Sequence, residues 1–118
     1  VSYCGPHFVF VCLPENQRML SFWLGGTRRE VPEQYRRASP AAFVSPDDPP
    51  MFFFHGEKDS LVPVESPQLM VRKLNDVGVP SELYLVPDTG HMFAVMDRGA
   101  LQKSVRFLSK HLSPEAQP

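Results

Sequence analysis

Two loop residues of this 118-residue chain have the types and the placement that acid–base chemistry needs. Asp59 lies in His-Gly-Glu-Lys-Asp-Ser-Leu-Val-Pro, residues 55–63, and His91 lies in Gly-His-Met-Phe, residues 90–93. A carboxylate beside an imidazole orients the ring and stabilises its protonated form. If the two side chains meet, they form the acid–base half of a nucleophile–histidine–aspartate triad.

Each of these residues also has a simpler interpretation. An aspartate before a helix is most often a turn or cap residue, and a histidine in a glycine-containing loop is most often a surface or packing residue. Gly56 and Gly90 favour tight turns whether or not catalysis follows. Spacing alone therefore leaves both interpretations of Asp59 and His91 open.

The elements that must position the two loops alternate between strand and helix. Residues 51–54 and 83–86 are short continuous apolar runs bounded by proline or glycine, which is typical of strands buried on both faces. The intervening residues 65–77 favour a helix that ends at Gly78. This order predicts a βαβ unit with parallel strands, whose carboxyl edge carries both loops and is where α/β sheets bind ligands.

The flanking segments extend this α/β pattern. Residues 1–4 resemble the end of a buried strand, and residues 8–50 predict a helical, proline-rich connection in which Thr27 and Glu30 fit a capping box. We expect Phe22 and Trp23 to be core residues or, alternatively, to line a substrate pocket. The last helix is predicted over residues 98–112, with one apolar stripe. That stripe consists of Leu101, Val105, Leu108 and Leu112.

Composition and charge exclude several other classes of protein. Apolar residues make up 42% of the chain and charged residues 21%, which fits a packed domain rather than a disordered chain or a coiled coil. The net charge of −1 provides no electrostatic footprint for nucleic acid. No apolar run approaches the roughly 20 residues of a membrane span, and Cys4 and Cys12 form no metal motif.

The two loops and the proline-rich stretch together resemble the α/β-hydrolases. Residues 55–63 are similar to the family's acid loop, His-Gly-x-x-Asp-x-x-Val-Pro, and residues 90–93 to its histidine loop, Gly-His-x-Phe. Residues 24–35, 38–40 and 44–50 resemble one branch more closely, the bacterial esterase/lipase group with carboxylesterase-like and feruloyl-esterase-like members. The resemblance implies a partial α/β-hydrolase fold of about three parallel strands with flanking helices.

The same resemblance implies a serine hydrolase that acts on small-molecule esters without a metal or cofactor. Asp59 would be the acid and His91 the base of its triad. A prolyl-oligopeptidase-type peptidase and a non-catalytic α/β module are the alternatives.

The chain departs from the family's pattern at the nucleophile, which the family carries in Gly-x-Ser-x-Gly. None of the ten serines has glycine at both −2 and +2. We therefore expect residues 1–118 to be the C-terminal part of a single α/β-hydrolase domain, with residues 8–50 as a connection within it. Alone, such a chain is expected to be inactive and either to self-associate through an exposed sheet edge or to be only marginally stable.

Overall fold

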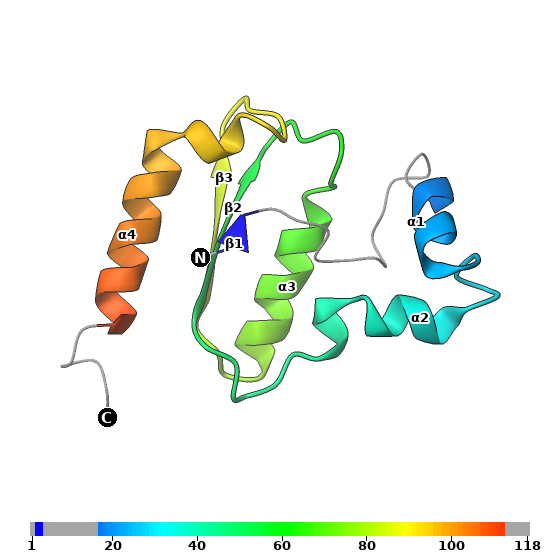
Figure 1. Ribbon diagram of the computed structural model, residues 1–118. Coiled ribbons are helices and arrows are strands. Elements are labelled where there is room, and N and C mark those ends of the chain that lie inside the picture. Colours follow the sequence, from blue (N-terminus) through cyan, green and yellow to red (C-terminus); the bar gives the residue numbers. More distant parts are fainter. Residues whose placement is uncertain (1, 4–16, 113–118) are drawn as a thin grey trace.

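A three-stranded parallel sheet with helices on both faces forms the centre of the molecule, in a computed structural model that describes residues 2–3 and 17–112 (Figure 1). The predicted α/β class is confirmed. The elements in chain order are β1 (Ser2–Tyr3), α1 (Gln17–Leu24), α2 (Pro32–Arg37), β2 (Met51–Gly56), α3 (Glu65–Asp76), β3 (Ser81–Val86) and α4 (Arg98–Leu112). Two short 3₁₀ turns lie at Pro40–Ala42 and Ala94–Met96.

The sheet has the order β1-β2-β3, and both of its pairings are parallel. The β2–β3 register runs from Met51 opposite Ser81 to Gly56 opposite Val86, so both strands end at one level. Helix α3 connects them, which confirms the predicted strand–helix–strand unit. The expectation that the β3 run is buried on both faces is wrong. Most of β3 is instead only partly buried, because it is the outer strand.

Alternate side chains of β2 enter two separate cores. Phe53 packs with Met70 and Leu74 of α3, whereas Phe52 packs with Phe107 of α4 on the opposite face. Figure 1 shows α3 and α4 on either side of the sheet. Because β2 is covered on both faces, its three phenylalanines are buried.

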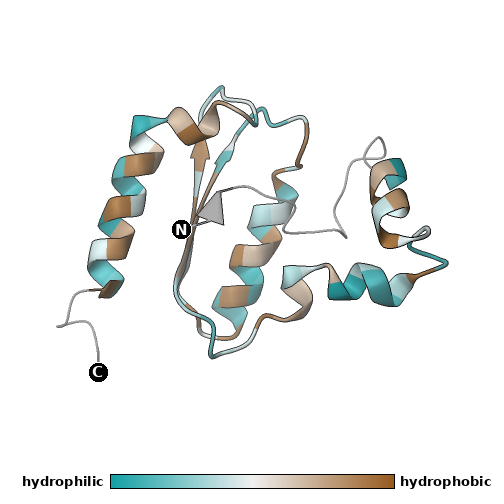
Figure 2. Cartoon of the chain, in the orientation of Figure 1, coloured by the Kyte–Doolittle hydropathy of each residue, from teal (hydrophilic) through white to brown (hydrophobic). Residues whose placement is uncertain are grey.

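Helix α4 contacts the sheet through a different face from the one that the leucine spacing suggested. Its buried residues are Ala100, Ser104 and Phe107. Small side chains at Ala100 and Ser104 let the helix lie close to the strands. The stripe that begins at Leu101 is exposed. The brown bands along α4 in Figure 2 mark the apolar residues of this helix.

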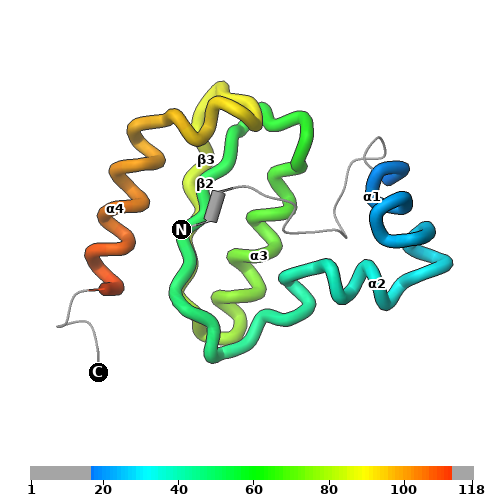
Figure 3. The backbone as a smooth tube through the Cα atoms, in the orientation of Figure 1, coloured from blue at the N-terminus to red at the C-terminus, as the bar shows by residue number. Residues whose placement is uncertain are grey.

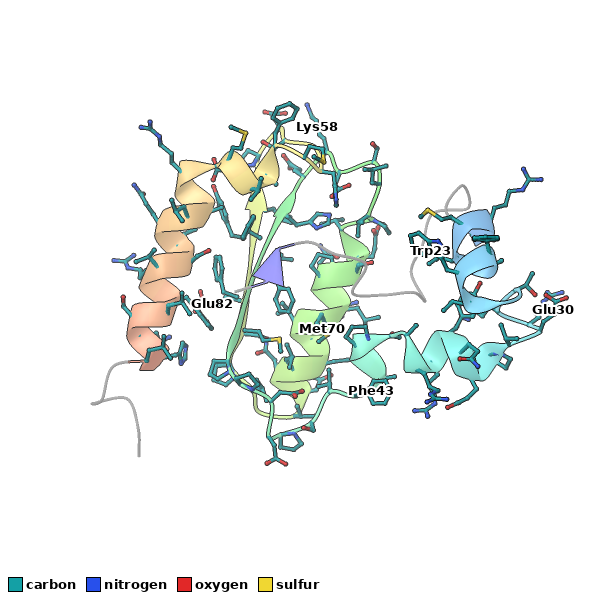
Figure 4. The ribbon with its side chains drawn as sticks, viewed as in Figure 1. Trp23, Glu30, Phe43, Lys58, Met70 and Glu82 are labelled. Carbon is teal, nitrogen blue, oxygen red and sulfur yellow. The ribbon has the colours of Figure 1, made fainter. Side chains whose placement is uncertain are left out.

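Helices α1 and α2 pack mainly against each other, on the far side of α3 from α4 (Figure 3). Their shared core is small and centres on Leu20 and Tyr35. The expectation that Phe22 and Trp23 are core residues is wrong, since they are 84% and 65% exposed (Figure 4). The reason is that, within the part of the chain that the structure describes, Leu20 is the α1 side chain buried against another element.

The predicted capping box forms only in part, since the Glu30 N–H donates to the Thr27 carbonyl and not to the Thr27 hydroxyl. The pair closes a turn rather than beginning a helix. The Glu30 carboxylate accepts hydrogen bonds from the Thr27 N–H at 2.8 Å and from the Thr27 hydroxyl at 2.7 Å. Helix α2 begins later, at Pro32, with Val31 at its N-cap. Among the described helices, none has the length and apolar character needed to cross a membrane.

Candidate active site

The acid loop after β2 and the histidine loop after β3 are joined by main-chain hydrogen bonds at one edge of the sheet. The N–H of Glu57 donates to the carbonyl of Val86 at 3.0 Å, and the N–H of Lys58 donates to the carbonyl of Thr89 at 2.9 Å. The Lys58 ammonium also lies 2.6 Å from the Asp88 carboxylate (Lys58 is labelled in Figure 4). The relative position of the two loops is therefore fixed by their backbones.

Gly56 makes this close approach possible. A Cβ atom at this position would lie 2.3 Å from the Thr89 carbonyl oxygen and 2.8 Å from that of Gly90. Carbon and oxygen do not approach so closely without a shift of the backbone. Glycine at position 56 is therefore a steric requirement of the crossing loops.

The structure brings Asp59 and His91 together, as the sequence analysis expected. The ring Nδ1 of His91 donates to Oδ2 of Asp59 at 2.7 Å. The Asp59 side chain is 1% exposed and that of His91 is 20% exposed. In this bond the proton stays on Nδ1 of His91 and faces the carboxylate, so Nε2 is the ring nitrogen that can accept a proton.

Asp59 is also the turn residue that the simpler interpretation predicted. Its second oxygen, Oδ1, accepts the N–H groups of Leu61 and Val62, each at 2.9 Å. These two bonds hold the carboxylate against its own loop while Oδ2 turns toward His91. Turn formation and imidazole binding therefore use different oxygens of one carboxylate.

His55 is a member of this site that the sequence analysis did not single out. Its side chain is fully buried, and its Nε2 lies 2.9 Å from the Val62 carbonyl oxygen and 3.3 Å from Oδ2 of Asp59. If Nε2 carries the proton, this N–H group donates to the Val62 carbonyl and also faces the Asp59 carboxylate. A signal was present in the sequence, because His55 ends an apolar strand four residues before Asp59.

The surroundings of Asp59 favour its ionised form. Burial alone raises the pKa of this carboxyl, but hydrogen bonds from the Val62 N–H, the His91 ring and the Leu61 N–H outweigh burial. The net pKa of Asp59 lies below its usual value of 3.8. Near neutral pH the site therefore holds an ionised Asp59 carboxylate that faces the His91 ring.

A lowered pKa predicts how Asp59 contributes to stability as pH changes. A carboxyl with a lower pKa in the folded state stabilises the protein above its unfolded pKa, and this contribution disappears as pH falls through the folded value. We expect the difference in unfolding free energy between wild type and Asp59→Asn to shrink below about pH 4. Urea denaturation at a series of pH values measures it. A difference that stays constant down to about pH 2 would contradict the assignment.

Comparisons with known proteins identify related hydrolases. The BD-FAE family matches residues 10–74, a range that includes Asp59 and ends before His91. The chain is 31% identical over 96 residues to "Uncharacterized peptidase YtmA" of Bacillus subtilis (strain 168), covering 79% of this chain and 37% of that protein. It is 37% identical over 89 residues to "Esterase LipC" of Mycobacterium tuberculosis, covering 71% of this chain and 22% of that protein.

A solved structure supports the same relationship. The "Truncated form of carbohydrate esterase from gut microbiota" superimposes with a TM-score of 0.67 and 26% identity, over 73% of this chain and 30% of that chain. The chain thus spans little more than a third of the length of YtmA and less of the other two. These relatives and the observed sheet agree on a partial α/β-hydrolase fold.

Proposed function

Since the chain belongs to the BD-FAE family, whose fold is that of the α/β-hydrolases, we propose that it supplies the acid and the base of a serine hydrolase triad for ester hydrolysis. The observation that carries this proposal is the 2.7 Å bond between His91 Nδ1 and Asp59 Oδ2 at the carboxyl edge of a parallel sheet. In α/β sheets this edge is where substrates bind. Asp59 is buried, as suits a carboxylate that orients the imidazole. His91 is partly exposed, as suits a general base that must reach the substrate.

In the proposed reaction, a serine hydroxyl attacks the carbonyl carbon of the ester while Nε2 of His91 takes the hydroxyl proton. The tetrahedral intermediate then expels the alcohol, which receives that proton from Nε2. Water attacks the acyl-serine in the same way, releasing the carboxylic acid and restoring the serine. Asp59 remains ionised throughout and stabilises the imidazolium that forms in each step.

His55 acts in this proposal as a positioning residue for Asp59. It binds the carbonyl of Val62, whose N–H in turn binds Oδ1 of Asp59, and it lies within 3.3 Å of Oδ2. The carboxylate is thus surrounded by two amide groups and two imidazoles. Such a network limits the rotation of Asp59 and keeps Oδ2 directed at His91.

The nucleophile of the proposed triad lies in sequence that precedes Val1, because residues 1–118 contain no Gly-x-Ser-x-Gly. On this proposal the chain is the C-terminal part of one hydrolase domain. The exposed leucine stripe of α4 and the outer position of β1 support it, since both are apolar or unpaired surfaces that further parts of the same domain would cover. In an isolated chain these surfaces favour self-association.

The alternative activity is peptide hydrolysis, which the name of the YtmA relative favours. Acid and histidine loops of this kind serve both reactions, because both proceed through an acyl-serine. A panel of p-nitrophenyl esters and aminoacyl p-nitroanilides, assayed on the longer protein, separates the two. Faster turnover of the anilides would replace the esterase proposal by the peptidase one.

The proposal predicts that the 118-residue chain alone does not hydrolyse p-nitrophenyl acetate above the rate in buffer. A His–Asp pair without a nucleophile and oxyanion donors lacks the groups that bind and attack the carbonyl. The longer protein should hydrolyse the same ester. Turnover by the isolated chain that disappears in His91→Ala would mean that residues 1–118 contain a nucleophile of their own, contrary to the proposal.

A further inference from the structure

Helix α4 concentrates positive charge in a chain that is otherwise acidic. It carries Arg98, Lys103, Arg106 and Lys110 and no Asp or Glu, whereas the rest of the chain has eight basic residues against thirteen acidic ones. The net charge of −1 is therefore the sum of a positively charged helix and a negatively charged remainder of the chain. A local excess of this kind attracts anions.

Three of these cations line one pocket of about 310 Å³ between α4 and β3. Lys103, Arg106 and Lys110 are spaced 3 and 4 residues apart, which puts them on one side of the helix. The other lining residues are Phe52, Glu82, Leu83, Tyr84 and Phe107. Figure 4 shows Glu82 between α4 and the sheet.

The charges in this pocket are not balanced within the part of the chain that the structure describes. Glu82 is the one acidic residue in the lining, and it lies 3.9 Å from the Lys110 ammonium, a distant pair between exposed groups. The Lys103 ammonium lies 4.8 Å from the centroid of the Tyr84 ring. Among the described residues Arg106 has no ion pair or hydrogen bond, and its neighbours along this side of α4 are the cations Lys103 and Lys110.

The remaining walls are apolar and partly aromatic. Phe52 and Phe107 pack with their ring centroids 5.6 Å apart, and Tyr84 lies beside them in the same core. The pocket lies where α4 covers β3, the strand at the end of the described sheet away from β1. It is lined by none of the residues of the Asp59–His91 site.

We propose that this pocket between β3 and α4 binds a small aromatic carboxylate. The guanidinium of Arg106 presents paired donors that match a carboxylate, and the flanking lysines add to the attraction. The ring of the ligand would pack on the ring of Tyr84, because Phe52 and Phe107 behind it are only 2% and 4% exposed. This inference is independent of the proposed hydrolase function.

Saturation-transfer NMR on the 118-residue chain, with benzoate as the probe, tests the proposal. We expect benzoate to bind with a dissociation constant on the order of 1 mM, as suits a ligand of this size. Benzamide has the ring without the charge, and acetate has the charge without the ring. Both should bind at least about fivefold more weakly, because each lacks one of the two contacts.

Matched variants locate the binding. Arg106→Gln should weaken benzoate binding by at least about fivefold, through loss of a charged hydrogen bond. Arg72→Gln, an exposed arginine on α3 at the other face of the sheet, should leave it unchanged. Far-UV circular dichroism confirms that all three proteins are folded. Equal binding of benzoate and benzamide, equal binding of benzoate and inorganic phosphate, or equal effects of the two variants would overturn the proposal.

Discussion

On the proposed function, replacing Asp59 by asparagine in the longer protein should lower kcat for ester hydrolysis about 10⁴-fold. An asparagine can direct its NH₂ group at His91, whose Nδ1 then becomes the acceptor and whose Nε2 carries the proton. An imidazole in that tautomer cannot take the proton of a serine hydroxyl. The loss should therefore fall on kcat, with a much smaller change in KM.

Asp88→Asn is the matched control for this variant. It makes the same chemical change in the neighbouring loop, where the Asp88 carboxylate is exposed and pairs with Lys58. Asp88 also has a φ of 52°, a conformation that asparagine tolerates well. Loss of the Asp88 carboxylate should change kcat less than about twofold, since an exposed ion pair contributes little to stability. Similar losses in the two variants would show that Asp59 has no special role.

The second large effect is expected from Gly56→Ala. The new methyl group would lie 2.3 Å from the Thr89 carbonyl oxygen, so the histidine loop must move away from the acid loop. The oxygen belongs to the backbone and accepts the Lys58 N–H, which leaves no flexible side chain to give way. We expect a loss of about 2–4 kcal/mol in unfolding free energy, measured by urea denaturation.

Gly90→Ala provides the comparison for Gly56→Ala, because it adds the same methyl group to the same pair of loops. At position 90 the closest atom would be the Lys58 carbonyl oxygen at 3.8 Å, an ordinary contact. Its effect on stability should remain within about 1 kcal/mol. Equal destabilisation by the two alanines would mean that the close approach at Gly56 is not what limits substitution.

The sequence predicted the central part of the fold because local and long-range signals agree there. Residues 51–54 of β2 form a continuous apolar run and the strand is covered on both faces, and α3 and α4 lie within one residue of their predicted ranges. Parallel pairing then places Asp59 and His91 at one edge, which is why their contact could be expected before any coordinates were known.

Other features depend on tertiary contacts that spacing does not encode. Two neighbouring faces of α4 are apolar enough to pack, and the small residues Ala100 and Ser104 decide which one meets the sheet. Phe22 and Trp23 are exposed because α1 has α2 as its main neighbour. The position of His55 beside Asp59 requires the turn of the loop through Val62, which no local pattern specifies.

The central claim is that Asp59 and His91 activate a serine in sequence that precedes Val1. Labelling the longer protein with a fluorophosphonate, followed by mass spectrometry of its peptides, tests this most directly. The reagent bonds to an activated serine oxygen with loss of fluoride. We predict a single labelled serine within a Gly-x-Ser-x-Gly upstream of Val1, with labelling slowed at least about 100-fold in His91→Gln, because the general base is lost. Labelling at the wild-type rate in His91→Gln, or no labelled serine in the active wild-type protein, would contradict the account.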